Sequence, residues 1–424
     1  MTAASMDAAE GAADTLTGEA KPEQPVWADV LIVGGGLVGG TLAIALAEAG
    51  LSSLVVEAGD PQAALDAGFD GRCSAIALSS KRMLGALGLW EPLAADAAPM
   101  LDIRVTDGPS RLFLHYDHRE VGDEPFGFML ENRLLRRALL ARMMAEPAIR
   151  LLAPDRVVRL ERSGDGVDAW LASGRRLRAT LAVAAEGRAS RTRDEAGIRV
   201  TRWGYRQTAI VCTVRHQRPH GFVAHEHFLP AGPFAILPLQ PGDRSSLVWT
   251  EREALAPLIM AGSEAQFLVE LRRRFGDFLG ELAVEGPRFS HPLSLQYAER
   301  SIDRRLALVG DAAHAMHPIA GQGLNMGFRD VAALTEVLAD AKGRRQDPGD
   351  ARVLARYQRW RRFDNTLMLA MTDGLNRLFS NDIAPIRLAR DLGLAGVNRL
   401  PPLKRLFMRH AMGLAGELPR LMRG

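Results

Sequence analysis

The stretch DVLIVGGGLVGGTLAIALAEAGLSSLVVE, which runs from Asp29 to Glu57, decides the fold of this chain. Its apolar start predicts a buried strand over Val30–Val33, and a helix is expected from about Leu37 to a position before Gly50. The residues after Gly50 predict a second strand that ends at Glu57. Between the first strand and the helix, three glycines follow the spacing G-x-G-x-x-G: Gly34, Gly36 and Gly39.

This strand–turn–helix–strand pattern is typical of a dinucleotide site. Glycines at that spacing permit a tight turn and a close approach of the backbone to a pyrophosphate, which the N-terminus of the helix then faces. Glu57 can accept hydrogen bonds from ribose hydroxyls, and an acidic residue at this position argues against a 2′-phosphate. The spacing occurs once in the 424 residues. We therefore predict one permanently held dinucleotide and no separate nicotinamide-binding fold.

A second informative stretch is LALVGDAAHAMHPIAGQGLNMGFRD, from Leu306 to Asp330. An apolar strand delivers the acidic residue Asp311, and a turn rich in Pro and Gly leads into a helix expected from about Leu324. The free N–H groups at a helix start favour negative charge placed against them. Together with the upstream fingerprint, this stretch predicts the second half of a flavin site.

Composition agrees with a globular enzyme of two or three domains, because 424 residues with 47% hydrophobic and 24% charged residues are ordinary values for such proteins. No apolar run reaches the roughly 18 residues that span a bilayer. Residues 1–25 are rich in Ala, Gly and acidic residues and contain no Arg, so we expect a disordered tail rather than a targeting peptide. The distant Cys73 and Cys212 fit a reducing compartment and a cytoplasmic location.

These segments resemble the flavin-dependent hydroxylases of ubiquinone biosynthesis, which have the para-hydroxybenzoate hydroxylase-type fold. The run from His317 to Asp330 matches the family signature throughout. In the family's middle motif, an Asp-Gly pair is usual, whereas this chain has Glu186 at the acidic position. The similarity also includes the stretches FDGRCSAIALS (Phe69–Ser79), ENRLLRRALL (Glu131–Leu140) and GPFAILPL (Gly232–Leu239).

The resemblance implies an α/β fold in which a Rossmann-like FAD-binding domain is interleaved with a substrate domain built on a mostly antiparallel β-sheet, followed by C-terminal helices. The strand and helix patterns place the FAD-binding domain in residues 26–97, 129–200 and 300–345. The substrate domain is expected in residues 98–128 and 201–299, and the helical region in residues 346–424.

The fingerprint and the resemblance together imply two sets of site residues. The residues expected to bind FAD are Gly34, Gly36, Gly39, Glu57, Arg72, Asn132, Glu186, Gly310, Asp311, Gly323, Leu324 and Asn325. The helix start expected to stabilise the negative charge of the reduced flavin comprises Pro318, Gly321, Gln322 and Gly323. In the family, a Pro–aromatic strand tip lines the pocket over the flavin ring, and here that tip is Pro233 and Phe234, with Ile236 and Leu237 beside it.

The implied activity is that of an FAD-dependent monooxygenase, which hydroxylates a polyprenylated phenol with O2 through a flavin C4a-hydroperoxide. The electrons would come from NAD(P)H or from a separate electron-transfer protein. Because Glu186 departs from the family pattern, we expect weak or no direct oxidation of NADPH. Two alternatives remain open: a hydroxylase or epoxidase of another apolar or small aromatic substrate, and a non-catalytic, lipid-binding flavoprotein subunit of a biosynthetic complex.

A metal site is not predicted for this chain. His225 and His227 flank Glu226 at strand spacing, so both imidazoles would point to one side, but no third His or Cys follows nearby.

The segment from Pro385 to Gly424 carries eight Lys or Arg against two acidic residues, interleaved with Leu, Phe and Met. This mixture is typical of an element that binds a membrane surface, or of a terminal helix that packs on the core with a solvated basic face. The tightest basic cluster is Arg399, Lys404, Arg405 and Arg409. The first interpretation predicts a peripheral protein at the inner face of the cytoplasmic membrane, with other ubiquinone-biosynthesis enzymes as further candidate partners. Nucleic acid is not an expected partner.

Overall fold

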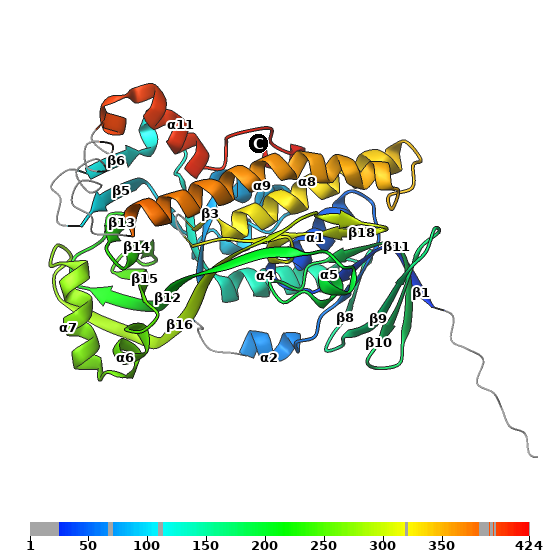
Figure 1. Cartoon of the computed structure of the whole chain (residues 1–424), viewed down its shortest axis with the longest axis horizontal. Coiled ribbons are helices and arrows are strands. Elements are labelled where there is room, and N and C mark those ends of the chain that lie inside the picture. Colours follow the sequence, from blue (N-terminus) through cyan, green and yellow to red (C-terminus); the bar gives the residue numbers. More distant parts are fainter. Residues whose placement is uncertain are drawn as a thin grey trace, which may run out of the picture.

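A computed structural model describes residues 25–66, 71–108, 113–318, 321–380, 390, 393 and 396–423. Residues 1–24, which make up most of the expected tail, therefore lie outside the described residues. The same holds for residues 69–70 at the start of the segment Phe69–Ser79. Within the described part, the strands form two eight-stranded sheets and one three-stranded sheet. Long helices run along the top of the molecule, where α8 and α9 lie side by side (Figure 1).

The first sheet is parallel at its centre and has its strands in the order β18-β11-β1-β2-β8. Its central strands are nearly continuous apolar runs because helices and a hairpin cover both faces. The parallel strands are β1 (Val26–Val33), β2 (Ser53–Val56), β8 (Ile149–Leu152), β11 (Arg176–Ala184) and β18 (Leu306–Leu308). Antiparallel additions are β17 (Ile302–Asp303), β9 (Val157–Arg162) and β10 (Val167–Leu171).

The helices beside this sheet are α1 (Leu37–Glu48), α4 (Asn132–Ala145), α8 (Gly323–Gly343) and α9 (Ala351–Phe379). The predicted helix starts near Leu37 and Leu324 agree with α1 and α8 to within one residue. Gly39 to Leu46 of α1 are all buried, because α1 packs between the sheet, α4 and α8. The N-termini of α1 and α8 therefore belong to helices that contact each other.

The second sheet has its strands in the order β19-β16-β12-β15-β14-β13-β5-β6. All neighbours are antiparallel except β13 and β5, so the predicted α/β fold with a mostly antiparallel second sheet is confirmed. The strands are β5 (Asp102–Asp107), β6 (Phe113–Asp117), β12 (Val200–His216), β13 (Val223–Leu229), β14 (Gly232–Leu239), β15 (Arg244–Arg252), β16 (Leu282–Ala298) and β19 (His314–Ala315).

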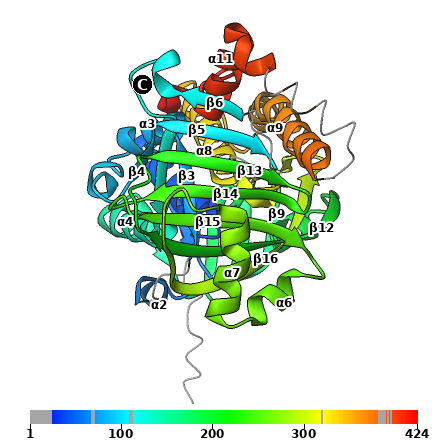
Figure 2. The ribbon, with the colours of Figure 1, turned by 90° about the vertical axis from the view of Figure 1, so that its left-hand side faces the viewer.

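Helix α7 (Glu264–Phe275) covers one face of the second sheet, and α8 lies behind the other face (Figure 2). The apolar stripe of α7, which consists of Phe267, Leu271 and Phe275, packs into a core with strand residues that include Trp249. The opposite face of the sheet therefore faces α8 and the other helices that lie beside the first sheet.

A small three-stranded sheet joins these parts and has the order β3-β7-β4. Its strands are β3 (Cys73–Ala77), β7 (Gly127–Glu131) and β4 (Ala98–Met100). Its apolar side chains share one core with Met408 of the C-terminal helix α11 (Pro401–Ala411). The other α-helices of the described residues are α2 (Pro61–Asp66), α3 (Leu78–Ala86), α5 (Arg191–Glu195) and α6 (Ala256–Ala261).

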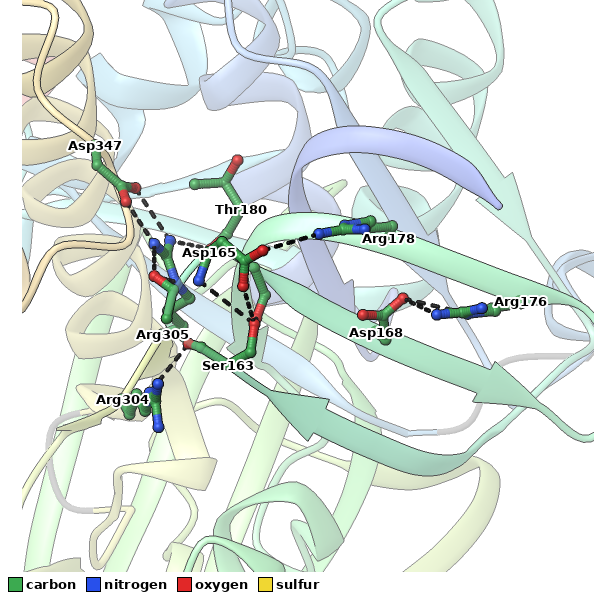
Figure 3. Close-up of polar contacts among 11 residues, drawn as sticks. Ser163, Asp165, Asp168, Arg176, Arg178, Thr180, Arg304, Arg305 and Asp347 are labelled. Atoms are coloured by element: carbon green, nitrogen blue, oxygen red, sulfur yellow. Dashed lines mark hydrogen bonds and ion pairs between the residues drawn. The ribbon is translucent and has the colours of Figure 1, made fainter. Parts of the chain in front are cut away.

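Arg305 connects the outer hairpin of the first sheet to the turn before α9 (Figure 3). This buried guanidinium donates to the carbonyl oxygens of Gly164 (3.0 Å) and Thr180 (2.9 Å) and to the carboxylate of Asp347 (3.1 Å). Because each bond reaches a different element, Arg305 fixes the end of α9 that is remote from the second sheet. Among the described residues, no helix is both long and apolar enough to span a bilayer.

Candidate functional site

A cavity of about 1170 Å³ lies where the first sheet's helices meet the second sheet. Its walls come from the starts of α1 and α8, from β13 and β14, and from the second half of α9. The walls are mostly apolar side chains. Polar groups lie near the two helix starts, and others, which include Glu226, Thr250 and Arg390, lie on the remaining walls. A pocket with apolar walls and a few convergent polar groups is the usual form of a site for a cofactor and an organic substrate.

The glycine turn before α1 leaves open space in front of the helix. A Cβ atom on Gly34 would lie 2.6 Å from the carbonyl oxygen of Ala185, and one on Gly39 would lie 1.9 Å from that of Gly34, so packing requires glycine at both positions. A Cβ atom on Gly36 would meet no protein atom within 4 Å. Because Gly36 is also the N-cap of α1, this open space fits a pyrophosphate that approaches the helix start.

Glu57 orders the glycine turn. Its carboxylate accepts hydrogen bonds from the backbone N–H groups of Gly35 (2.7 Å) and Gly59 (2.8 Å). The side chain therefore stands at the end of β2 next to the turn, where the sequence predicts it. A ribose contact for Glu57 stays a prediction.

The acidic residues of the second stretch have different surroundings. Asp311 is about half exposed and lines the cavity, with its carboxylate 3.4 Å from Nε of Arg188. Asp330 is fully buried and accepts hydrogen bonds from the N–H of Gly310 (3.0 Å) and from His314 Nε2 (2.6 Å). Asp330 thus holds the turn that presents Asp311 to the cavity.

The start of α8 is tied to the small sheet. The Asn325 side chain donates to the carbonyl of Ala75 (2.8 Å) and accepts from the N–H of Ala77 (2.9 Å), so the helix cannot shift along β3 without breaking both bonds. The predicted residues of this helix start that line the cavity are Pro318, Gly321, Gln322, Gly323, Leu324 and Asn325. Asn132 lines it as well and accepts a hydrogen bond from the Ser74 hydroxyl (2.6 Å).

Seven predicted FAD ligands are not among the residues that line the cavity: Gly34, Gly36, Gly39, Glu57, Arg72, Glu186 and Gly310. The side chains of Arg72 and Glu186 have other surroundings. Arg72 is exposed, and its carbonyl oxygen accepts the N–H of Asn132 (3.0 Å). The Glu186 carboxylate accepts hydrogen bonds from the Ser190 hydroxyl (2.6 Å) and the N–H of Thr192 (3.2 Å). Glu186 therefore caps the first turn of α5 instead of facing the cavity.

The expected pocket role of Phe234 needs a correction. Side chains alternate between the two faces of a strand, and β14 directs Pro233, Ala235 and Leu237 into the cavity. Phe234 and Ile236 point to the opposite face and are buried in the core beneath α7. Of the four residues predicted to line the pocket, only Pro233 and Leu237 do so.

A residue that the sequence did not assign to the cavity is Glu226. It lies on β13 and lines the cavity, and burial raises the pKa of its carboxyl to about 7. The sequence presented it only as the centre of a His-Glu-His triplet, whose two imidazoles stack with their centroids 5.8 Å apart. Strand alternation predicts that Glu226 points away from both histidines, but the sequence does not show which face is lined by the cavity.

His317 lies at the beginning of the family signature and is completely buried. Neither ring nitrogen has a hydrogen-bond partner in the part of the chain that the structure describes. Its ring packs edge-on against Tyr205, with the centroids 5.2 Å apart, and burial lowers the pKa of His317 to about 4. The imidazole is therefore neutral at physiological pH.

Comparison with known proteins agrees with this geometry. Residues 27–367 match the family described as "FAD binding domain". Ubiquinone hydroxylase UbiL of Rhodospirillum rubrum is 58% identical, with 98% of this chain and 97% of UbiL covered. The 3-demethoxyubiquinol 3-hydroxylase of Escherichia coli is 35% identical, with 91% and 98% covered. In fold, the chain is similar to p-nitrophenol 4-monooxygenase PnpA of Pseudomonas putida, with a TM-score of 0.77 at 20% identity and 92% and 99% covered. The chain therefore belongs to the FAD-binding hydroxylase family of ubiquinone biosynthesis.

Proposed function

We propose that this protein uses FAD and O2 to hydroxylate the aromatic ring of a polyprenylated phenol that is a precursor of ubiquinone. The names of its relatives describe hydroxylases of ubiquinone or of its precursors. The observation that carries the proposal is the continuous cavity that connects both helix starts with the apolar face of the second sheet. Such a cavity has room for a flavin ring and an apolar substrate together.

The residues at the two helix starts fit FAD. The open space at Gly36 would receive the pyrophosphate, Asp311 would hold a ribitol hydroxyl, and the N-terminus of α8 after Gln322 would face the flavin ring. Bound FAD would supply the two-electron chemistry that activates O2, with electrons from NAD(P)H or from a separate electron-transfer protein. The chain itself positions the substrate ring and excludes water, since the remaining walls are mostly apolar.

The tail of the substrate would leave the cavity between α9 and α11. Leu375 and Leu378 of α9 line the cavity and are also 37% and 46% exposed, so they stand where the cavity reaches the surface. Phe407 of α11 lines the same region. Each methylene of a prenyl tail that is buried here adds about 0.8 kcal/mol to binding.

The same surface is suited to contact an anionic membrane. Leu400 and Leu406 beside and within α11 are 55% and 57% exposed. Three exposed arginines stand among them and have no ion pair within the described residues: Arg399, Arg405 and Arg409. Lys404 does not belong to this surface, because it is buried and its ammonium lies 2.6 Å from the Glu120 carboxylate. The proposed membrane contact therefore uses three of the four basic residues of the predicted cluster.

The flavin itself provides the test of this function. The purified protein is loaded with FAD, its absorbance is bleached with dithionite in the absence of oxygen, and O2 is then admitted with 2-geranylphenol. We expect the oxidised spectrum to return together with a product that is heavier by one oxygen atom. Flavin that binds but cannot be reduced would instead favour the lipid-binding subunit.

A further inference from the structure

Glu226 is the acidic side chain at the centre of the cavity's sheet wall. Strand β13 pairs Glu226 with Val105 of β5 on one side and with Ala235 of β14 on the other. One strand further, β15 places Val248 next to Ala235, and β6 places Leu114 next to Val105. All of these residues line the cavity. The row across the sheet is thus apolar except for one carboxyl group.

This carboxyl has no partner within the described part of the chain. No hydrogen bond or ion pair to Glu226 occurs there, and the shift of its pKa comes from burial alone. Arg390, a cation that also lines the cavity, is engaged by Asp107, with Nε 2.8 Å from Oδ2. Glu226 is half-buried at the cavity wall. An acidic group that is largely withdrawn from water and has no partner destabilises the fold, so its presence calls for a role other than stability.

The polarity of the cavity indicates what Glu226 would contact. The FAD-facing end of the cavity has its own polar groups at the helix starts, whereas Glu226 carries the single carboxyl of the sheet wall, where the other polar lining residues are His225 and Thr250. A ligand that matches this wall is an apolar ring with one hydroxyl donor. A hydroxyl that donates to a carboxylate makes one of the stronger hydrogen bonds found in proteins.

We propose that the Glu226 carboxylate binds the phenolic hydroxyl of the substrate and accepts its proton during hydroxylation, an inference that rests on the proposed function. The O–H bond of the phenol breaks, the proton moves to the Glu226 carboxylate, and the electron pair stays on the phenol oxygen. The ring carbons beside and opposite that oxygen become richer in electrons, which favours attack on the oxygen atom delivered from FAD-activated O2. A C–O bond forms as the O–O bond breaks, with two electrons supplied by reduced FAD. The ring then regains its aromatic form by losing the proton of the hydroxylated carbon, and the second oxygen atom takes up protons and leaves as water. The proton on Glu226 returns to the phenol oxygen.

Binding of two matched probes to the FAD-loaded protein tests the contact. The probes are 2-geranylphenol and its methyl ether, which lacks the hydrogen-bond donor and has one added methyl group, and Glu226→Leu serves as the control for the effect of that methyl group. We expect the wild type to prefer the phenol by about tenfold or more, and Glu226→Leu to bind both probes equally. Glu226→Leu removes a half-buried carboxyl and should fold with an unchanged or higher melting temperature. An undiminished preference in Glu226→Leu would overturn the proposal.

Turnover of 2-geranylphenol tests the proton transfer. Glu226→Gln should lower the rate roughly 10²- to 10⁴-fold with normal FAD content, and Glu226→Asp should recover part of it. The matched control is Glu253→Gln, because Glu253 is exposed and does not line the cavity. If wild type and Glu226→Gln hydroxylate the probe equally fast, this inference fails while the proposed function stands. If the wild type neither binds nor hydroxylates it, both fail.

Discussion

Nε of Arg361 lies 2.8 Å from a carboxylate oxygen of Asp330, and both side chains are almost completely buried. The pair joins α9 to α8, and Asp330 also holds the turn at Gly310. Burial alone would raise the pKa of Asp330, but the neighbouring His314 and Arg361 outweigh burial and hold that pKa below its ordinary value. The last residue of the family signature is therefore an ionised structural anchor behind the cavity.

Removing this charge should destabilise the protein strongly. Asp330→Asn removes the carboxylate that His314 and Arg361 share and leaves Asp364 as the remaining counter-charge of the buried Arg361, so we expect a loss of about 3 kcal/mol in the free energy of unfolding. Urea unfolding followed by circular dichroism measures the change. The control is Glu195→Gln, which breaks an exposed pair with Arg191 and should cost less than about 1 kcal/mol. Equal stabilities for the two variants would contradict the anchor role.

Protonation of His317 should lower the stability of the protein when the solution is acidified below neutral pH, whereas Glu226, whose pKa burial raises from 4.5 to about 7, acts in the opposite direction between these two values. Burial lowers the pKa of His317 from 6.5 to about 4, so the unfolded chain binds a proton in this window and the native protein does not. Above pH 6.5, His317 is neutral in both states and does not lower the free energy of unfolding. As the pH falls from 6.5 to about 4, the unfolded state gains the proton first, so the free energy of unfolding decreases progressively. His225, with a pKa lowered to about 3, acts in the same direction.

Unfolding with urea at several pH values measures this dependence. A His317→Leu variant cannot take up the proton when it unfolds, so its stability should fall less steeply over the same window than that of the wild type. Identical slopes for both proteins would show that His317 does not carry the effect.

The open space at Gly36 gives a clean test of the cofactor site. A side chain there meets no protein atom, so Gly36→Val should fold normally but fill the space reserved for the pyrophosphate. We expect FAD to be lost during gel filtration. Gly343→Val is the matched control, because Gly343 is exposed at the end of α8 and also has open space around it. Full FAD retention in Gly36→Val would show that the pyrophosphate does not bind at this turn.

The proposed membrane contact predicts different effects for neighbouring basic residues. Replacing Arg399, Arg405 and Arg409 with Gln should abolish salt-sensitive sedimentation with anionic vesicles, since each cation near the surface adds about 1 kcal/mol of attraction. The melting temperature should not change. Lys404→Gln should leave vesicle binding intact and lower the melting temperature, because it breaks the buried pair with Glu120. An unchanged pellet for the triple variant would end the membrane interpretation of this segment.

Local patterns were enough to predict much of this architecture. The glycine turn after Val33 and the helix starts near Leu37 and Leu324 follow from apolar spacing and turn residues that are neighbours in sequence. The pairing of β13 with β5 depends instead on contacts between strands that lie far apart in the chain. Sequence spacing alone does not specify such contacts.

The site was predicted less completely for the same reason. Period-2 alternation separates Pro233 from Phe234, but only the position of α7 shows that the Phe234 face is core. The burial of Lys404 depends on Glu120, which is 284 positions away. Glu226 became a candidate only when the structure placed its side of β13 against the cavity.

The central claim is that FAD and a prenylated phenol meet in one cavity and that an oxygen atom from O2 enters the ring. The direct measurement is the mass of the product formed from 2-geranylphenol by the reduced, FAD-loaded protein under O2 enriched in a heavy oxygen isotope. The account predicts a product that contains one heavy oxygen atom in the wild type and no product in Gly36→Val. Reoxidation of the flavin without labelled product, or label that comes from water, would contradict it.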